Sequence, residues 1–146
     1  MSDSISENKI ILYRLMITDI ELSYEGYSCD FEIGVFTSAQ EAVTTAEYYL
    51  SHISGFKDYP CKYRIDEKEC IGNSTEGELK EVWQAWGYNY NEKKDETELV
   101  ESCYFTTEEV AEKELKILKA QFIRDEWGID RYPIGQKCWM EGFVRK

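Results

Sequence analysis

An internal repeat is the feature of this sequence that most constrains how the chain folds. When the sequence is shifted by 69 positions, which is the spacing between Phe36 and Phe105, its two halves align without a gap. Because self-similarity at a fixed period is the signature of repeated structural units, we expect the chain to build the same local fold twice. The aligned residues are Phe36-Thr37 with Phe105-Thr106, Ala42 with Ala111, Tyr63 with Tyr132, Ile65 with Ile134 and Lys68 with Lys137.

Each repeat contains one segment whose apolar residues share a face at helical spacing. These segments predict helices over Ala39–Ser54 and Glu108–Ile123. Both follow the shared Phe-Thr pair, where a hydroxyl side chain can accept a hydrogen bond from an unpaired amide of the first turn. Ser38 or Thr37 is the expected cap of the first helix, and Thr106 has the T-x-x-E spacing at the start of the second.

Extended segments flank both helices, two before each helix and one after it. The expected strands are Lys9–Ile17, Cys29–Phe36, Cys61–Cys70, Glu81–Tyr90, Glu98–Phe105 and Arg131–Met140. A polar linker at Asn73–Glu78 joins two β-β-α-β repeats, of about residues 8–72 and 79–143. One repeat alone would leave much of its sheet uncovered. We therefore expect a single α+β domain over residues 1–146, pseudo-twofold, with about six mostly antiparallel strands and two helices.

The charge of the chain excludes several classes of partner. It carries 29 acidic and 17 basic side chains, for a net charge of −12. Nucleic-acid binding needs a local excess of Lys and Arg, so we expect no nucleic-acid partner. The polar, acidic N-terminus is unlike a secretory signal, and no run approaches the ~18 apolar residues of a membrane span. The sequence therefore predicts a cytoplasmic protein with no membrane partner.

No residue pattern identifies a reaction, a metal or a cofactor. The five cysteines include no Cys-x-x-Cys pair. Because we expect no signal peptide, we predict that these cysteines are reduced thiols. The single histidine, His52, could be a general base, but a histidine at a helix C-terminus often only complements the helix dipole. The acids around Asp66 could bind an ion or form a solvated face. We expect no metal site, no cofactor and no catalytic residue.

The most unusual segment is the aromatic run Trp83–Tyr90. Trp86, Tyr88 and Tyr90 share one face of the expected strand, and Trp83 lies on the other. Since both faces are apolar, the strand is either buried on both sides or presents one aromatic row for binding. Both interpretations remain open at this point.

Acidic residues accompany aromatic rings at two further places. One is Asp125–Asp130 after the second helix, and the other is the first hairpin tip, with Tyr24 and Tyr27. Each could be a polar loop anchored by one buried ring, or part of a binding surface in which rings anchor and carboxylates orient a partner. The candidate partner-binding residues are Trp86, Tyr88, Trp127, Asp125, Glu126 and Asp130.

Three short motifs carry a resemblance to known proteins. They are Val35-Phe36-Thr37-Ser38 before an alanine-containing helix, Gly55-Phe56-Lys57-Asp58, and Trp139-Met140-Glu141-Gly142-Phe143. Together they resemble a group of small uncharacterised bacterial domains, and small acidic domains of this type also resemble immunity proteins, which neutralise a co-encoded toxin. The second half departs from the pattern at Arg124-Asp125, where Gly-Phe is expected.

The resemblance and the charge favour a non-enzymatic inhibitor of the immunity type. Such a protein would cover the basic active-site cleft of a cognate toxin with its acidic, aromatic surface. The alternative is a small-molecule-binding or sensor module with a tyrosine-lined pocket between the two repeats. An enzyme that uses scattered carboxylates has the least support. The sequence makes no prediction of oligomeric state.

Overall fold

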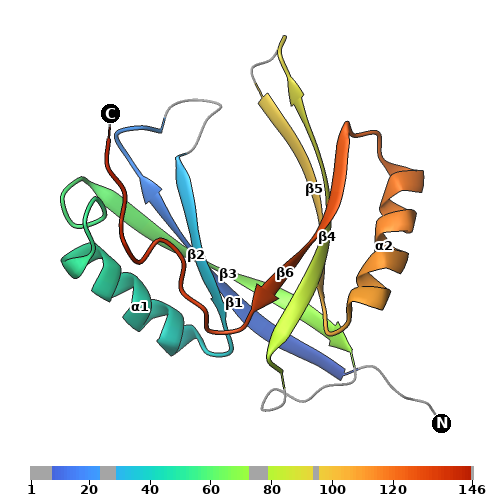
Figure 1. Ribbon diagram of the computed structural model, residues 1–146, viewed down its shortest axis with the longest axis horizontal. Helices are drawn as coiled ribbons and strands as arrows, with labels where there is room; N and C mark the ends of the chain where they lie inside the picture. The colour runs from blue at the N-terminus through green and yellow to red at the C-terminus, as the bar shows by residue number, and fades with distance from the viewer. Residues whose placement is uncertain (1–7, 24–28, 73–78, 94–95, 146) are drawn as a thin grey trace. The chain divides into compact units, whose positions relative to one another are not determined.

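The computed structural model describes residues 8–23, 29–72, 79–93 and 96–145 of the protein (Figure 1). Two expected features lie outside these residues. They are the linker Asn73–Glu78 and the tip of the first hairpin, including Tyr24 and Tyr27.

The helices and strands follow the order that two β-β-α-β repeats predict. They are β1 (Asn8–Asp19), β2 (Asp30–Phe36), α1 (Ala39–His52), β3 (Cys61–Gly72), β4 (Glu81–Asn91), β5 (Glu96–Phe105), α2 (Glu108–Gln121) and β6 (Glu126–Pro133). The six strands form one sheet in the order β2-β1-β3-β5-β4-β6. β1 pairs with β2, and β4 with β5 and β6, in antiparallel fashion, whereas β3 and β5 are parallel. This confirms the α+β class, the six strands and the two helices.

The chain divides into two compact units that do not coincide with the two sequence repeats. Unit 1 comprises Met1–Ile11 and Lys68–Ile134, and unit 2 comprises Leu12–Glu67 and Gly135–Lys146. The boundaries therefore fall inside β1, inside β3 and just after β6. Each unit contains one of the two helices, with the strand residues that this helix covers.

The two helices confirm the 69-residue repeat. Each has 14 residues, and α2 begins 69 positions after α1. Ser38 caps α1, because its hydroxyl accepts a hydrogen bond from the Glu41 amide at 3.1 Å. In α2 the cap is Thr107, the repeat partner of Ser38, and the expectation of Thr106 is wrong. Both helices end two residues earlier than predicted.

The last strand differs from the prediction. A strand over Arg131–Met140 was expected, but β6 spans Glu126–Pro133. The first repeat has residues 53–60 between its helix and its third strand, whereas the second has only residues 122–125. The second repeat lacks the Gly-Phe turn at this place, so the chain enters its third strand after a shorter connection.

Residues 135–145 follow β6, belong to unit 2 and form a segment that we call the C-terminal strap. The strap lies along the outer edge of β2. The Gly135 amide donates to the carbonyl oxygen of Val35, and the Cys138 amide to that of Ile33, both at 2.8 Å. The strap therefore supplies backbone partners to a strand that would otherwise be an open edge.

The strap also closes the core of unit 2. Phe143 stacks on Phe31 with ring centroids 4.6 Å apart and meets Phe56 edge-on at 4.9 Å. Its backbone passes close to the end of α1, where a Cβ on Gly142 would lie 2.1 Å from the Ser54 carbonyl oxygen. The Trp-x-Glu-Gly-Phe motif thus has a packing role, in which the glycine allows the close approach.

An ion pair between a half-buried arginine and a buried carboxylate fixes the end of the strap. The Asp19 side chain has no exposed surface, and Arg145 Nη2 lies 2.6 Å from its Oδ1. Arg145 Nε donates to Asp19 Oδ2 at 3.1 Å, while Nη1 donates to Glu21. The guanidinium also lies 3.7 Å above the ring of Tyr59.

We expect Tyr49→Phe to destabilise the protein by weakening the hold of α1 on the strap. Tyr49 is 1% exposed, and its hydroxyl donates to the Cys138 carbonyl oxygen at 2.8 Å. Burial raises the pKa of Tyr49 to about 12, so the hydroxyl keeps its proton. Loss of this bond should lower the free energy of unfolding by about 1 kcal/mol, measured by urea denaturation. The matched control is Tyr48→Phe, because Tyr48 is 51% exposed; equal effects of the two changes would contradict the assigned role.

Candidate protein-binding face

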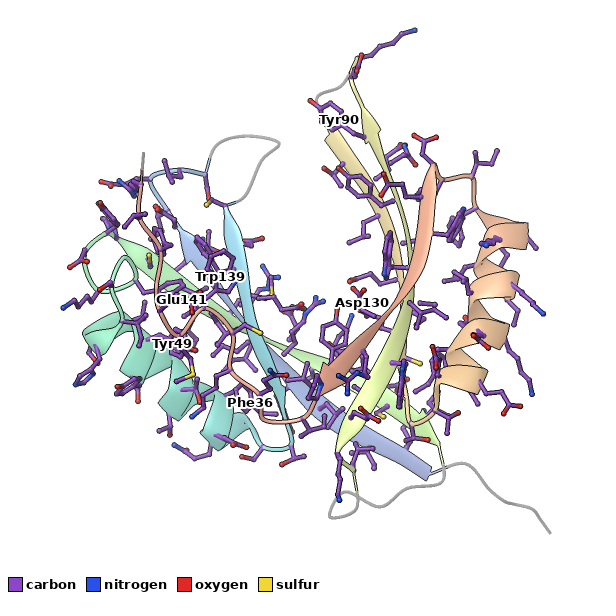
Figure 2. The ribbon with its side chains drawn as sticks, in the orientation of Figure 1. Phe36, Tyr49, Tyr90, Asp130, Trp139 and Glu141 are labelled. Carbon is purple, nitrogen blue, oxygen red and sulfur yellow. The ribbon has the colours of Figure 1, made fainter. Side chains whose placement is uncertain are left out.

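In unit 1, α2 packs against one face of the sheet formed by β5, β4 and β6 (Figure 1). Ala111 and Leu118 of the helix are buried there. Asp130 of β6 points to the opposite side of the sheet, away from α2 (Figure 2). The faces of the remaining residues follow from the strand register, because residues directly opposite each other on neighbouring strands share a face.

The register of β4 with β6 brings four of the six predicted partner-binding residues to one face. Tyr88 lies opposite Glu126, Trp86 opposite Gly128, and Gln84 opposite Asp130. Since residues two apart on a strand point to the same side, Trp86, Tyr88, Glu126 and Asp130 share the face away from α2. Tyr90 and Leu99 extend it towards the end of the hairpin, since Leu99 lies opposite Tyr88. We call this surface the aromatic–acidic face, and its residues are Trp86, Tyr88, Tyr90, Leu99, Glu126 and Asp130.

Exposure increases along this face. Gln84 is buried, Trp86 and Tyr88 are half-buried, and Tyr90 and Leu99 are 46% and 52% exposed. Glu126 and Asp130 are both exposed. Of the two interpretations of the aromatic run, the structure therefore favours one covered face and one aromatic row that reaches solvent at its outer end.

The structure places the other two predicted residues elsewhere. Trp127 lies opposite Gly87 on the face towards α2, and a Cβ on Gly87 would lie 2.4 Å from its ring. Asp125 is exposed and precedes β6, outside the paired strand. Of the two interpretations of Asp125–Asp130, the polar loop is wrong, because all but the first residue of this segment belong to β6.

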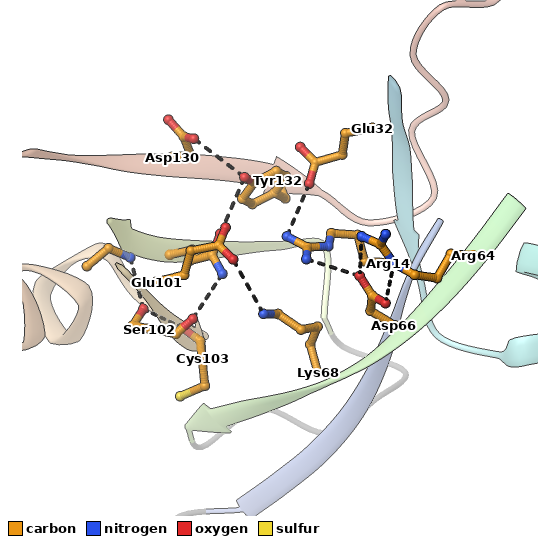
Figure 3. Close-up of polar contacts among 12 residues, drawn as sticks. Arg14, Glu32, Arg64, Asp66, Lys68, Glu101, Ser102, Cys103, Asp130 and Tyr132 are labelled. Carbon is orange, nitrogen blue, oxygen red and sulfur yellow. Dashed lines mark hydrogen bonds and ion pairs between the residues drawn. The ribbon is translucent and has the colours of Figure 1, made fainter. Parts of the chain in front are cut away.

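Polar contacts position the inner end of the face (Figure 3). The Tyr132 hydroxyl lies 3.4 Å from both Gln84 Oε1 and Asp130 Oδ2. Gln84 Nε2 donates to the Ser102 carbonyl oxygen at 2.9 Å. Lys68 Nζ lies 3.9 Å from Glu101 Oε1, so the positive charge of Lys68 is paired with a carboxylate of unit 1. The exposed charge of the face is consequently acidic, from Glu126 and Asp130.

Asp66 and His52, which the sequence offered as candidates for ion binding or general-base chemistry, both have structural partners in unit 2. Burial alone would raise the pKa of Asp66, but hydrogen bonds from Arg64 and Arg14 hold it below its usual range (Figure 3). The ring of His52 stacks on Tyr48, and its Nδ1 lies 2.8 Å from Ser51 Oγ. Within the part of the chain that the structure describes, no three metal-ligating side chains gather to hold an ion.

The thiols are poor nucleophiles where they are buried. Burial raises the pKa of Cys61 to about 11 and that of Cys70 to about 12. Few of these thiols are therefore ionised near neutral pH, and the thiolate is the reactive form. Cys138, by contrast, is exposed on the strap.

A cavity of about 390 Å³ in unit 2 is a feature that residue patterns did not reveal. It lies between α1 and the strap. Tyr48 and Tyr49 line it from the first repeat, and Lys137 and Met140 line it from the second. Only the unexpected path of the strap brings these residues together. Its other lining residues are Thr44, Thr45 and Ile53.

Comparison of the chain with family models, curated proteins and solved structures gives no match. The resemblance to small bacterial domains and immunity proteins therefore stays a prediction. Neither described helix is long and apolar enough to cross a membrane.

We expect Gly128→Ala to disturb the face at Trp86. A Cβ at this position would lie 2.5 Å from the indole ring, so the ring must move. The change should cost about 1–3 kcal/mol of unfolding free energy and shift the tryptophan emission spectrum. Urea denaturation followed by fluorescence measures both effects. In a Trp86→Ala background the same glycine change should cost much less, and an undiminished cost there would contradict the assigned contact.

Proposed function

We propose that this protein is a non-enzymatic inhibitor of the immunity type, which binds a basic protein, such as a cognate toxin, through its aromatic–acidic face. The observation that carries the proposal is the combination on one face of half-buried rings, at Trp86 and Tyr88, with exposed carboxylates, at Glu126 and Asp130. The net charge of −12 supports the same type of partner.

The two kinds of side chain would act at different stages of binding. Carboxylates attract a basic partner over several ångströms and raise its association rate, an effect that weakens as salt rises. Aromatic rings bury large rigid surfaces at the centre of an interface and slow dissociation. By covering a basic cleft, the protein would block access of substrate without performing chemistry of its own.

Trp127 and Asp125 have more limited roles in this proposal. Trp127 packs on Gly87 and holds β6 against β4, so it supports the face from behind. Asp125 is exposed beside the start of β6 and adds negative charge at the rim of the interface.

The test is to neutralise the two carboxylates with the double change Glu126→Gln and Asp130→Asn. A partner is first captured from source-cell lysate, and it qualifies only if it is toxic when expressed alone and harmless when co-expressed with this protein. The association rate should fall about tenfold at low salt, and its salt dependence should flatten.

The matched control removes the same charge from the covered side of the sheet. Glu108 and Glu112 are exposed on α2, so Glu108→Gln with Glu112→Gln changes the net charge equally. If both double variants weaken binding to the same extent, total charge is responsible and the face is not the interface.

A second candidate function is binding of a small organic anion, and the cavity in unit 2 favours it. Lys137 provides a positive charge, and Tyr48 and Met140 provide apolar surface. In a melting-temperature screen of small carboxylates, a binder should stabilise the protein, and Lys137→Ala should abolish that shift. The double change at Glu126 and Asp130 should leave it intact. Absence of any shift across the screen would count against this function.

A further inference from the structure

We propose that the partner adds a strand to the outer edge of β6, as an extended segment with a basic–x–apolar–x–basic pattern. The inference rests on the proposed function, because it specifies how the same face engages a basic protein. It adds a backbone contribution that the aromatic and acidic side chains alone would not provide.

The two outer strands of the sheet differ in how their edges are used. The strand order ends with β2 on one side and β6 on the other. The strap hydrogen-bonds to the outer edge of β2 at Ile33 and Val35. Among the described residues, β6 pairs only with β4, so its outer edge carries no strand. An open strand edge is a template for another chain.

The register identifies the backbone groups on that edge. The Ile134 amide donates to the Lys80 carbonyl oxygen at 2.8 Å, which places Ile134 in a hydrogen-bonded pair with β4. Such pairs alternate along antiparallel strands, so the N–H and C=O groups of Gly128 and Asp130 also point towards β4. The groups of Trp127, Ile129 and Arg131 consequently point outward, and they are the ones available to an added strand.

The side chains on the aromatic–acidic face define what the added strand must carry. Glu126 and Asp130 lie four positions apart on this face, with Gly128 between them. An added strand would place its own residues opposite these three, so two basic side chains would meet the two carboxylates. The residue between them would meet Gly128, over which the half-buried Trp86 ring lies, so an apolar side chain suits this position. This gives the proposed sequence pattern.

The strand-addition test uses the end-blocked peptide Thr-Lys-Thr-Val-Thr-Lys-Thr as a probe at low salt. Hydrogen exchange should slow about tenfold at the amides of Trp127, Ile129 and Arg131 when the peptide binds. N-methylation of the two threonines next to valine removes donors that face β6 and should weaken binding about tenfold or more. The matched control carries two methyl groups on the backbone nitrogens of the two lysines. These backbone nitrogens point away from β6, so the control should bind nearly as the parent peptide does.

A variant of the protein tests the same edge from the other side. Ile129→Pro removes one outward donor while sparing the β4–β6 ladder, since proline is tolerated on edge strands. It should weaken parent-peptide binding about tenfold, and Ile129→Val should not. If Ile129→Pro does not fold, the two methylated peptides still decide the question.

Three outcomes would overturn the inference. If the peptide binds but both methylated forms bind equally and no edge amide slows, the partner uses the face without adding a strand, and the proposed inhibitor function still stands. If no peptide binds, strand addition is rejected, while the toxin experiment with the Glu126 and Asp130 variant judges the function separately. If exchange at the edge amides slows with protein concentration alone, a second copy of the chain occupies the edge instead.

Discussion

A carboxylate without exposed surface has to be neutralised from within the protein, and Asp19 imposes this requirement on unit 2. The neutralising group is Arg145, which lies at the far end of the chain in sequence. To bring it there, the strap must follow the edge of β2 and pass α1. On this path it places Phe143 among the core aromatics and forms one wall of the cavity. The ion pair thus fixes the end of a route that the backbone bonds to β2 and the Phe143 contacts also hold.

Local signals are sufficient to predict the helices and most strands, because capping and apolar spacing act within a few residues. Ser38 and Thr107 show that even the capping position repeats after 69 residues. The end of the chain could not be predicted in this way. The strap departs from strand conformation at Gly135, Trp139 and Gly142, which have positive φ angles, and its course depends on contacts with residues distant in sequence. Arg131–Met140 contains both strand and strap, with Pro133 as the last residue of β6.

The candidate face was partly predictable for the same reason. Alternation within one strand is enough to place Trp86 and Tyr88 on the same side of the sheet. Pairing between strands decides which face Glu126, Trp127 and Asp130 occupy. Side chains alternate between the two faces of a sheet only within a strand, so interpreting this segment as a loop predicts no face for them. Once β6 pairs with β4, neighbouring residues separate to opposite faces. Trp127 then packs on Gly87, and the two carboxylates join the other aromatic row.

The course of the strap has a consequence for how the protein emerges from the ribosome. Unit 2 begins at Leu12, yet the ion-pair partner of Asp19 is Arg145, which is synthesised 126 residues later. At about 5–20 residues per second, the first repeat stays unfinished for several seconds while the second is made. Contacts this distant in sequence also slow folding. During that interval the Asp19 carboxylate lacks its arginine and the aromatic core lacks Phe143, so the time needed to synthesise residue 145 limits how early unit 2 can be completed.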